Sequence, residues 1–203
     1  MTLYALKPRF QAVLRPLVAR LCAAGVTANQ VTLAAAAGSL LVGGAIVGLG
    51  APSLAFLLVP LWMGPRMALN AVDGMLAREF GQRSRLGAYL NELADVVSDA
   101  ALYAPFALLP AFGAAWVGVV VVLAIVAEYA GVLGPMVGAS RRYDGPLGKS
   151  DRALVFGALG AWVGLGGALP LWLGWLMPVL AALLVATIVN RVRAGLREAA
   201  GGG

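Results

Sequence analysis

The strongest constraint on the fold is a series of apolar segments, each long enough to cross a lipid bilayer as a helix. We place six of them in the chain of 203 residues, at 29–49, 53–78, 86–110, 113–139, 152–169 and 171–192. A bilayer core requires about 20 predominantly apolar residues per helix. The composition agrees, because 61% of the residues are hydrophobic and only 12% are charged. The sequence therefore predicts an all-α, polytopic membrane protein with six transmembrane helices.

Basic residues follow a regular pattern relative to these segments. They lie before the first segment and after the second, fourth and sixth, at Lys7, Arg9, Arg15 and Arg20, at Arg78, Arg83 and Arg85, at Arg141, Arg142, Lys149 and Arg152, and at Arg191, Arg193 and Arg197. Lys and Arg are enriched in cytoplasmic loops, so both termini are predicted to be cytoplasmic. The pattern also explains the net charge of +6 through topology and anionic membrane lipids, without nucleic acid as a partner.

The segment before the first span has a different character. Within residues 9–24, basic side chains alternate with apolar ones, which is typical of an amphipathic helix that lies in the membrane interface; the alternative is a longer first span. With the six-helix bundle at 29–192, this helix forms a single predicted membrane domain over 1–203. The composition, rich in Ala, Gly and Arg, favours a bacterial inner (cytoplasmic) membrane.

The residue types also limit the chemistry. The chain has one cysteine, Cys22, and no histidine, which excludes an internal disulfide and any histidine-based metal site or triad. A bound metal would therefore need oxygen ligands, which favours Mg²⁺, Mn²⁺ or Ca²⁺.

Ionisable residues lie at membrane depth, where each costs roughly 2.5–3.5 kcal/mol on insertion scales. They are Arg66, Asp73, Glu92, Asp95, Asp99 and Glu128. Neither Arg66 nor Glu128 belongs to a motif, and we expect Arg66 to act as a counter-ion to Asp99 or Glu128.

The polar residues of the second and third segments share helix faces. Asn70 and Asp73 are three residues apart, and Asn91, Asp95 and Asp99 are four apart, so each set lies on one face. The two segments form a hairpin, so the two faces can meet just inside the cytoplasmic surface. Such a set of oxygen donors predicts a site for a divalent cation.

Other residues of this hairpin favour a phosphate-ester site. Gly74, Ala77 and Gly87 leave room for a ligand, and Arg78 at the mouth can pair with phosphate in a forked geometry. Two alternatives stay open at this point. A small transporter also places carboxylates at membrane depth, and the same residues can form structural ion pairs, Asp73 with Arg78, and Asp95 and Asp99 with Arg66.

The same stretch resembles the signature of the CDP-alcohol phosphotransferase family. Asp73-Gly74, Ala77-Arg78, Gly87 and Asp95 fall at the signature spacings, with eight residues between Arg78 and Gly87. Asn70 and Asn91 stand where the family has its first and third aspartates. The segment GVTANQVT at 25–32 resembles the family's sequence before its first span.

The resemblance implies a reaction and the residues that take part in it. A CDP-linked lipid, typically CDP-diacylglycerol, gives its phosphatidyl group to an acceptor hydroxyl and releases CMP, with two divalent metals, Mg²⁺ or Mn²⁺, on the pyrophosphate. Asp95 would be the general base, and a homodimer is expected. The cytidine and phosphate pocket would include Gly74, Ala77, Arg78, Gly87, Asn29 and Thr32.

The departures from the signature leave part of this expectation open. With Asn70 and Asn91, two negative charges are missing from the metal set, and Asp99 or the neighbouring Glu92 is expected to compensate, Asp99 being favoured because it shares the helix face. The chain is predicted to be an active enzyme; a catalytically degenerate lipid- or nucleotide-binding relative is the alternative. Lys149 and Arg152 are candidates for holding an anionic acceptor or the lipid phosphate.

Overall fold

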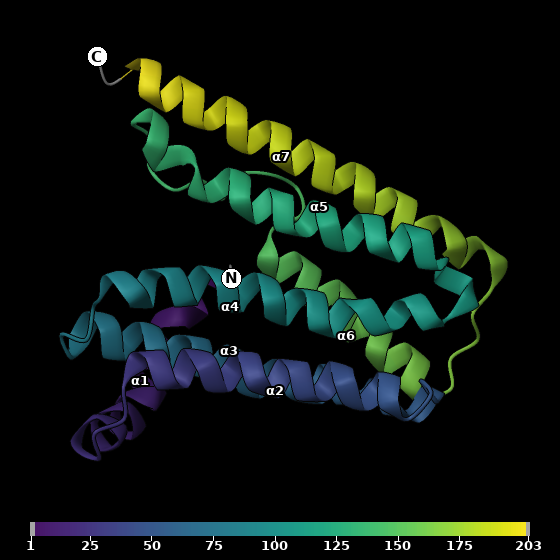
Figure 1. Cartoon of the computed structure of the whole chain (residues 1–203), viewed down its shortest axis with the longest axis horizontal. Helices are drawn as coiled ribbons and strands as arrows, with labels where there is room; N and C mark the ends of the chain where they lie inside the picture. Colours follow the sequence, from purple (N-terminus) through teal and green to yellow (C-terminus); the bar gives the residue numbers. More distant parts are fainter. Residues whose placement is uncertain (1–2, 202–203) are drawn as a thin grey trace. The chain divides into compact units, whose positions relative to one another are not determined.

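The computed structural model describes the backbone over residues 3–201 and the side chains from Phe10 to Gly201. Over this range the chain is helical, without strands (Figure 1). The α-helices are α1 (Leu3–Ala23), α2 (Ala28–Gly48), α3 (Leu58–Glu79), α4 (Arg85–Tyr103), α5 (Ala114–Val132), α6 (Lys149–Gly164) and α7 (Leu176–Gly201). Short 3₁₀ segments occupy Ser53–Leu57, Ala104–Leu108, Pro110–Phe112, Gly134–Val137 and Leu171–Trp175. The all-α prediction is confirmed.

Four helical stretches are long and apolar enough to cross a membrane. They are Ala28–Gly48, Ser53–Glu79, Ala114–Val132 and Leu171–Gly201. The two remaining predicted spans, 86–110 and 152–169, correspond to α4, which carries several charges, and to α6, which has only 16 residues. The integral membrane character is thus supported, whereas the count of six spans stays a prediction.

The chain folds into two compact units. The first contains the chain up to Leu41 together with Leu61–Ser98, and the second contains Val42–Pro60 and the chain from Asp99 onward. The unit boundaries fall within α2, α3 and α4. The single domain predicted over 1–203 stays a prediction, and its residues 1–2 and 202–203, like the Arg9 side chain of the predicted interfacial helix, lie outside the described residues.

The core of the first unit joins α1 to the start of α2 and the end of α3. Val18 of α1 is fully buried among apolar side chains of the other two helices, which include Val31, Val72, Met75 and Leu76. The opposite side of α1 leaves Val13 77% exposed. An apolar side chain in that position is consistent with a helix on the membrane surface, the location predicted from the sequence.

Local signals in the sequence fix where α2 begins. The Thr27 N–H donates to Gln30 Oε1 at 2.9 Å, and the Gln30 N–H donates to Thr27 Oγ1 at 3.3 Å. This reciprocal capping satisfies backbone donors that have no partner within the helix. Ser84 acts similarly before α4, because its hydroxyl accepts the Gly87 N–H at 2.9 Å. Both helix starts contribute to the site described below.

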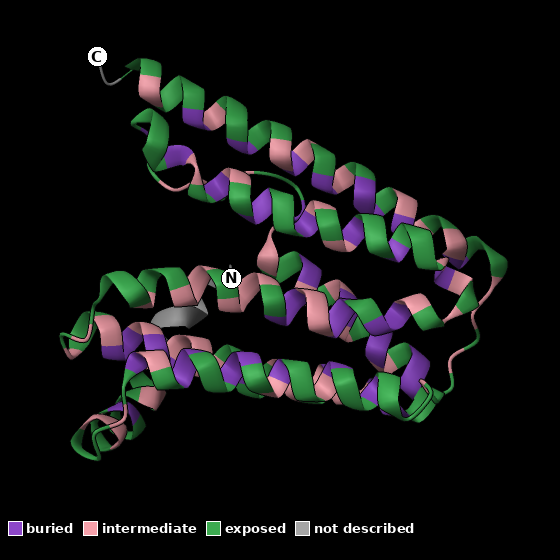
Figure 2. Ribbon diagram, in the orientation of Figure 1, coloured by how far each residue is buried: buried purple, intermediate pink, exposed green. Residues whose placement is uncertain are grey.

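The second unit is built on α5 and α7, which pack side by side (Figure 1), and on α6. An aromatic cluster fills its interior, with Tyr103 and Phe156 stacked at 3.9 Å between ring centroids. Gly160 lets α6 approach the segment Val42–Pro60 closely, because a Cβ there would lie 2.8 Å from the Phe56 carbonyl oxygen. Many residues of these helices are exposed (green in Figure 2). Large apolar ones such as Leu154 and Trp172 are among the exposed residues, as expected for helices that contact lipid.

Candidate active site

A pocket of about 370 Å³ lies in the first unit. Its walls come from the start of α2, the end of α3, the connection between α3 and α4, and the start of α4. The lining residues are Ala28, Asn29, Thr32, Asp73, Gly74, Ala77, Arg78, Gln82, Arg83, Ser84, Gly87, Ala88, Asn91 and Glu92. All six residues predicted from the sequence to line a cytidine and phosphate pocket are among them. Their role in binding stays a prediction.

Asp73 is the buried carboxylate of this pocket, with only 5% of its surface exposed. The Thr32 hydroxyl donates a hydrogen bond to Asp73 Oδ2 at 2.7 Å. The same hydroxyl lies 3.0 Å from the Ala28 carbonyl oxygen, so the carboxylate of α3 is held in place from the first turns of α2. Such a fixed acceptor suits the binding of a cation or of a donor group on a ligand.

Glycines in the pocket provide space that polar side chains use. A Cβ on Gly74 would lie 2.6 Å from Nη2 of Arg78, so the guanidinium folds over the backbone of its own helix. A Cβ on Gly87 would lie 2.8 Å from Asn29 Oδ1 and 2.9 Å from Ser84 Oγ. Any larger residue at either position would displace these polar groups, which explains why the signature has glycine there.

The predicted metal ligands fall into two groups. Asp73 and Asn91 line the pocket, whereas Asn70, Asp95 and Asp99 do not. Arg66 Nη2 lies 4.0 Å from Asp95 Oδ1 and donates to the Asp95 carbonyl oxygen at 3.3 Å.

The pocket offers few carboxylates to a cation. Among the described residues there is no group of three or more His, Cys, Asp or Glu side chains that could hold a metal. A cation there depends on amide as well as carboxylate oxygens: Asp73, Asn91 and Glu92 all line the pocket. Such an oxygen set fits a hard divalent cation, with less negative charge than four aspartates would supply.

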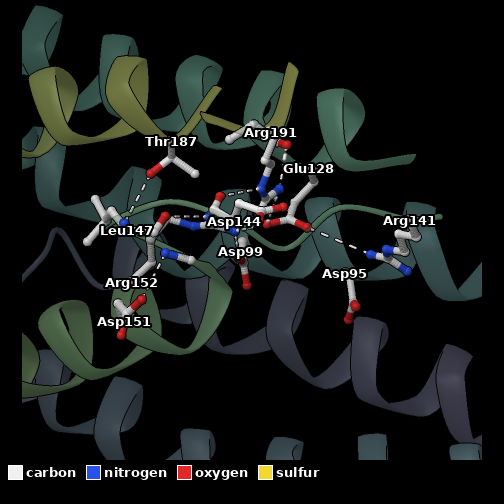
Figure 3. A network of polar contacts seen from close by, with 12 residues as sticks. Asp95, Asp99, Glu128, Arg141, Asp144, Leu147, Asp151, Arg152, Thr187 and Arg191 are labelled. Atoms are coloured by element: carbon white, nitrogen blue, oxygen red, sulfur yellow. Dashed lines mark hydrogen bonds and ion pairs between the residues drawn. The ribbon is translucent and has the colours of Figure 1, made fainter. Parts of the chain in front are cut away.

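Asp99 has a different environment in the second unit. Asp99 Oδ2 accepts a hydrogen bond from Arg152 Nη2 at 3.1 Å, and the same nitrogen donates to Glu128 Oε1 at 2.9 Å. Figure 3 shows Glu128 also directed toward Arg191 and Arg141, at 3.4 Å and 3.8 Å respectively. We call Asp99, Glu128, Arg141, Arg152 and Arg191 the ion network.

The ion network occupies two residues with predicted roles. Arg152 is only 1% exposed, and its guanidinium donates to protein carboxylates; binding of an anionic acceptor by Arg152 stays a prediction. Asp99 is 4% exposed and accepts a hydrogen bond from Arg152; metal binding by Asp99 stays a prediction. Burial of this kind requires pairing, and the pairing partner was not predicted from helix spacing. Lys149 begins α6, and its predicted role stays a prediction.

The connection between α5 and α6 carries a second group of charges. Arg142 contacts Glu198 of α7 and donates to both carboxylate oxygens of Asp144, at 2.9 Å and 3.1 Å. These hydrogen bonds from the Arg142 guanidinium hold the pKa of the Asp144 carboxyl below its usual value. The ion pair between Arg142 and Glu198 thus joins the connection to α7.

Sequence reasoning missed five residues of the pocket wall, Ala28, Gln82, Arg83, Ser84 and Ala88. Only Ser84 had a local signal, because a serine three residues before Gly87 is a typical helix N-cap. Gln82 joins parts of the chain that are far apart in the sequence, so no local pattern could have indicated its position.

Comparison with known proteins then defines the class. The CDP-alcohol phosphatidyltransferase family matches residues 25–189, which include the pocket and the signature from Asn70 to Asp95. Because this match covers most of the chain, the protein belongs to the CDP-alcohol phosphatidyltransferase family.

Two known proteins are similar to this chain in sequence. The chain is 48% identical over 199 residues to the inner membrane protein YnbA of Escherichia coli K12, covering 97% of each chain. It is 36% identical over 99 residues to a phosphatidylinositol phosphate synthase of Streptomyces avermitilis, covering 49% of this chain and 39% of the synthase.

Solved structures share the fold. The phosphatidylinositol phosphate synthase PgsA1 of Mycobacterium tuberculosis with CDP-DAG bound has a TM-score of 0.69 at 22% identity, covering 89% of this chain and 92% of that one. The same enzyme in complex with manganese and citrate also has a TM-score of 0.69.

Proposed function

We propose that this protein transfers a phosphatidyl group from a CDP-linked lipid such as CDP-diacylglycerol to an acceptor hydroxyl, with release of CMP. The observation that carries the proposal is the pocket, which gathers Asp73, Gly74, Ala77, Arg78 and Gly87 of the signature in one cavity. Family membership supports the reaction class, and the related PgsA1 with CDP-DAG bound supports the donor.

The pocket offers suitable groups for a nucleotide-linked phosphate. Arg78 presents its guanidinium over Gly74, and Arg83 is an exposed second cation at the same pocket. A guanidinium binds phosphate oxygens through parallel N–H donors. The small residues Gly74, Ala77 and Gly87 of the same pocket leave room for the cytidine, so binding and orientation of the donor are the tasks of these residues.

The proposed cofactor is Mg²⁺ or Mn²⁺. Asp73 and Asn91 would hold it from the pocket wall, and Asn70 and Asp95 belong to the same signature. A bound divalent cation stabilises the charge that develops on the phosphate and leaving-group oxygens. The manganese in the related PgsA1 supports such a cofactor, and the two asparagines predict weaker binding than four aspartates would give.

We propose Asp95 as the general base. Its carboxylate would take the proton of the acceptor hydroxyl while the acceptor oxygen bonds to the phosphorus of the phosphatidyl group. The bond from that phosphorus to the bridging oxygen breaks, and its electron pair leaves with CMP. Arg66, whose guanidinium lies 4.0 Å from Asp95 Oδ1, would keep the carboxylate in position between turnovers.

The proposal also covers the location, the orientation and the oligomeric state of the protein. We place the protein in the bacterial inner membrane as a homodimer, with both termini and the pocket on the cytoplasmic side. The similarity to an inner membrane protein supports the membrane, and the basic residues of alternate loops support the orientation.

The decisive experiment measures CMP release from CDP-diacylglycerol by purified protein. The reaction should contain Mg²⁺ or Mn²⁺ and one of several acceptors: serine, glycerol phosphate, inositol, inositol phosphate or phosphatidylglycerol. We expect CMP and a new phospholipid with at least one acceptor. Absence of CMP with every acceptor would refute the proposed reaction for these acceptors, and substrate flux into vesicles without CMP would indicate a transporter.

A non-catalytic binding relative is the second candidate. It is favoured by the lack of a cluster of three or more metal-binding acidic side chains among the described residues. Such a protein would bind CDP-diacylglycerol with micromolar or better affinity and release no CMP. The same purified protein therefore separates the two functions when binding and CMP release are measured together.

Asp95→Asn tests the assignment of the base. An amide cannot accept the acceptor proton, and positioned general bases contribute about 10²–10⁴-fold. We expect turnover to fall by that amount while donor binding is retained. Full turnover in this variant would remove Asp95 from the reaction.

A further inference from the structure

The side chain of Gln82 joins separate parts of the first unit. Its Oε1 accepts the Ala28 N–H at 2.7 Å, and its Nε2 donates to the Val26 carbonyl oxygen at 3.2 Å. The same nitrogen lies 3.8 Å from Cys22 Sγ of α1. Gln82 also lines the pocket. One carboxamide thus links the connection between α3 and α4 to the turn between α1 and α2.

The hydrogen bond between Gln82 and Ala28 lies at the start of α2. Ala28 is the first residue of α2, where backbone N–H groups have no partner within the helix. Thr27 and Gln30 satisfy each other's donors, and Gln82 satisfies that of Ala28. The start of α2 is therefore held by the local hydrogen bonds between Thr27 and Gln30 and by the long-range hydrogen bond from the Ala28 N–H to Gln82.

The position of this helix start determines one wall of the pocket. Asn29 and Thr32 line the pocket from the first turns of α2. The clearance is small, because Asn29 Oδ1 lies only 2.8 Å from where a Cβ on Gly87 would be. The Thr32 hydroxyl must also stay within hydrogen-bond distance of Asp73. A shift of the helix start by a fraction of an ångström would change both contacts.

We propose that Gln82 is a positioning residue for donor binding: it fixes the start of α2 so that Asn29 and Thr32 face Asp73 and Gly87 at the separation that the CDP group needs. This inference rests on the proposed function. Gln82 acts through the wall that it holds, and it takes no part in proton transfer. Its removal should consequently weaken the binding of the donor and leave the chemical step intact.

The test compares Gln82→Ala with Gln30→Ala. Both variants remove a side-chain bond to the backbone at the start of α2, but Gln30 is exposed and lies outside the pocket. Loss of one or two such bonds is worth about tenfold in binding. For Gln82→Ala we expect the KM for CDP-diacylglycerol to rise about tenfold with kcat nearly unchanged. For Gln30→Ala we expect a clearly smaller rise in KM and no change in kcat, because Gln82 still accepts the Ala28 N–H.

Gln82→Glu provides a rescue. A carboxylate can still accept the Ala28 N–H but cannot donate to the Val26 carbonyl, so we expect a KM between those of the wild type and Gln82→Ala. An unchanged KM in Gln82→Ala, or a fall in kcat alone, would overturn the inference. An equal effect of Gln30→Ala would assign the result to helix stability.

Cys22 gives a readout that does not depend on the reaction. It is the only cysteine of the chain and is partly exposed, so the rate of its alkylation reports on the contact with Gln82. We expect faster alkylation in Gln82→Ala than in the wild type and no change in Gln30→Ala. Equal alkylation rates in Gln82→Ala and Gln30→Ala would refute the contact between Gln82 and Cys22. A wild-type protein that releases no CMP would instead refute the proposed function and leave this alkylation result interpretable.

Discussion

The pocket of the first unit and the ion network of the second unit contain the same kinds of residue in different surroundings. In the pocket, Asp73 accepts a hydrogen bond from a neutral hydroxyl, and the nearby Arg78 is exposed. In the ion network, Glu128 contacts three guanidinium groups, and Arg152 is 1% exposed. A carboxylate at membrane depth therefore does not by itself indicate a binding site.

The difference lies in the space beside each carboxylate. Burying an ion without a partner is costly, and a buried pair repays that cost only with good geometry. Arg152 meets two carboxylates within 3.1 Å, so the ion network already compensates its charges with protein groups. The pocket provides a cavity beside its carboxylate, which leaves space for a cation and a phosphate. We infer that the first region binds ligand and that the second stabilises the fold.

The largest effect that this comparison predicts is on stability. Arg152→Leu leaves Asp99 and Glu128 buried without the guanidinium they share. Removing one partner of a buried ion pair costs about 3–5 kcal/mol. We expect the free energy of unfolding to fall by that amount and the apparent Tm in detergent to drop by roughly 6–20 °C.

A matched control is available on α7. Arg193 is exposed, so Arg193→Leu removes the same charge without breaking a buried pair. Substitutions of that kind change stability by about 0.5 kcal/mol or less. If Arg152→Leu were as stable as Arg193→Leu, the ion network would have no structural role, and the comparison with the pocket would fail.

Asp73→Asn addresses the other region and should affect activity rather than stability. The Thr32 hydroxyl can still donate to the amide oxygen, so we expect the apparent Tm to stay close to that of the wild type. Loss of a ligating carboxylate should reduce turnover by more than about 100-fold, since even outer-shell partners are worth about 10–100-fold. Turnover measured against Mg²⁺ and Mn²⁺ concentration should show a much weaker metal response.

Glu79→Gln is the corresponding control for Asp73→Asn. Glu79 is the last residue of α3 and pairs with Arg15 at 2.9 Å on the surface. This variant removes a charge from the same helix outside the pocket, so its metal response should match that of the wild type. An unchanged metal titration in Asp73→Asn would count against metal binding by Asp73.

The sequence predicted the pocket better than the ion network, for a physical reason. Gly74 and Arg78 are four residues apart on α3, and such spacing places side chains on one face. Gly87 follows on α4 after a short connection and lines the same pocket. By contrast, Arg152 and Asp99 are 53 residues apart, and Gln82 and Ala28 are 54 apart. Such contacts depend on how whole helices pack, which no local pattern specifies.

The helix boundaries show a similar limit. Hydropathy predicted spans at 86–110 and 113–139, whereas α4 ends at Tyr103 and α5 at Val132, each followed by a short 3₁₀ segment. Apolar composition continues past the helix end in both places, so it does not mark where the hydrogen-bonding pattern changes. Pro105 and Pro135 lie in these 3₁₀ segments, and proline disfavours continuation of an α-helix.

A smaller effect, on cation affinity, is expected when a carboxylate is added to the pocket. Asn91→Asp adds a carboxylate to the pocket lining, whereas Asn70→Asp adds one outside it. Because cation affinity rises with the number of charged ligands, we expect Asn91→Asp to lower the half-saturating Mg²⁺ concentration by about tenfold and Asn70→Asp to lower it less. Metal titrations of CMP release and of metal-dependent thermal stability would measure both. No change in Asn91→Asp would place residue 91 away from the cation.

The smallest expected effect concerns the connection between α5 and α6. This effect depends on pH. Arg142 keeps the pKa of Asp144 below its usual value by donating two hydrogen bonds to the carboxylate. A lowered pKa in the folded state means that the stabilisation is present above the unfolded pKa of about 3.9 and is lost as the pH falls through the folded value. Since the side chain is 38% exposed, the contribution is only a few tenths of a kcal/mol. Asp144→Asn should therefore lower the apparent Tm slightly at pH 7, and its difference from the wild type should shrink as the pH falls below about 3.9. A difference that does not change with pH would show that the charge does not stabilise this connection.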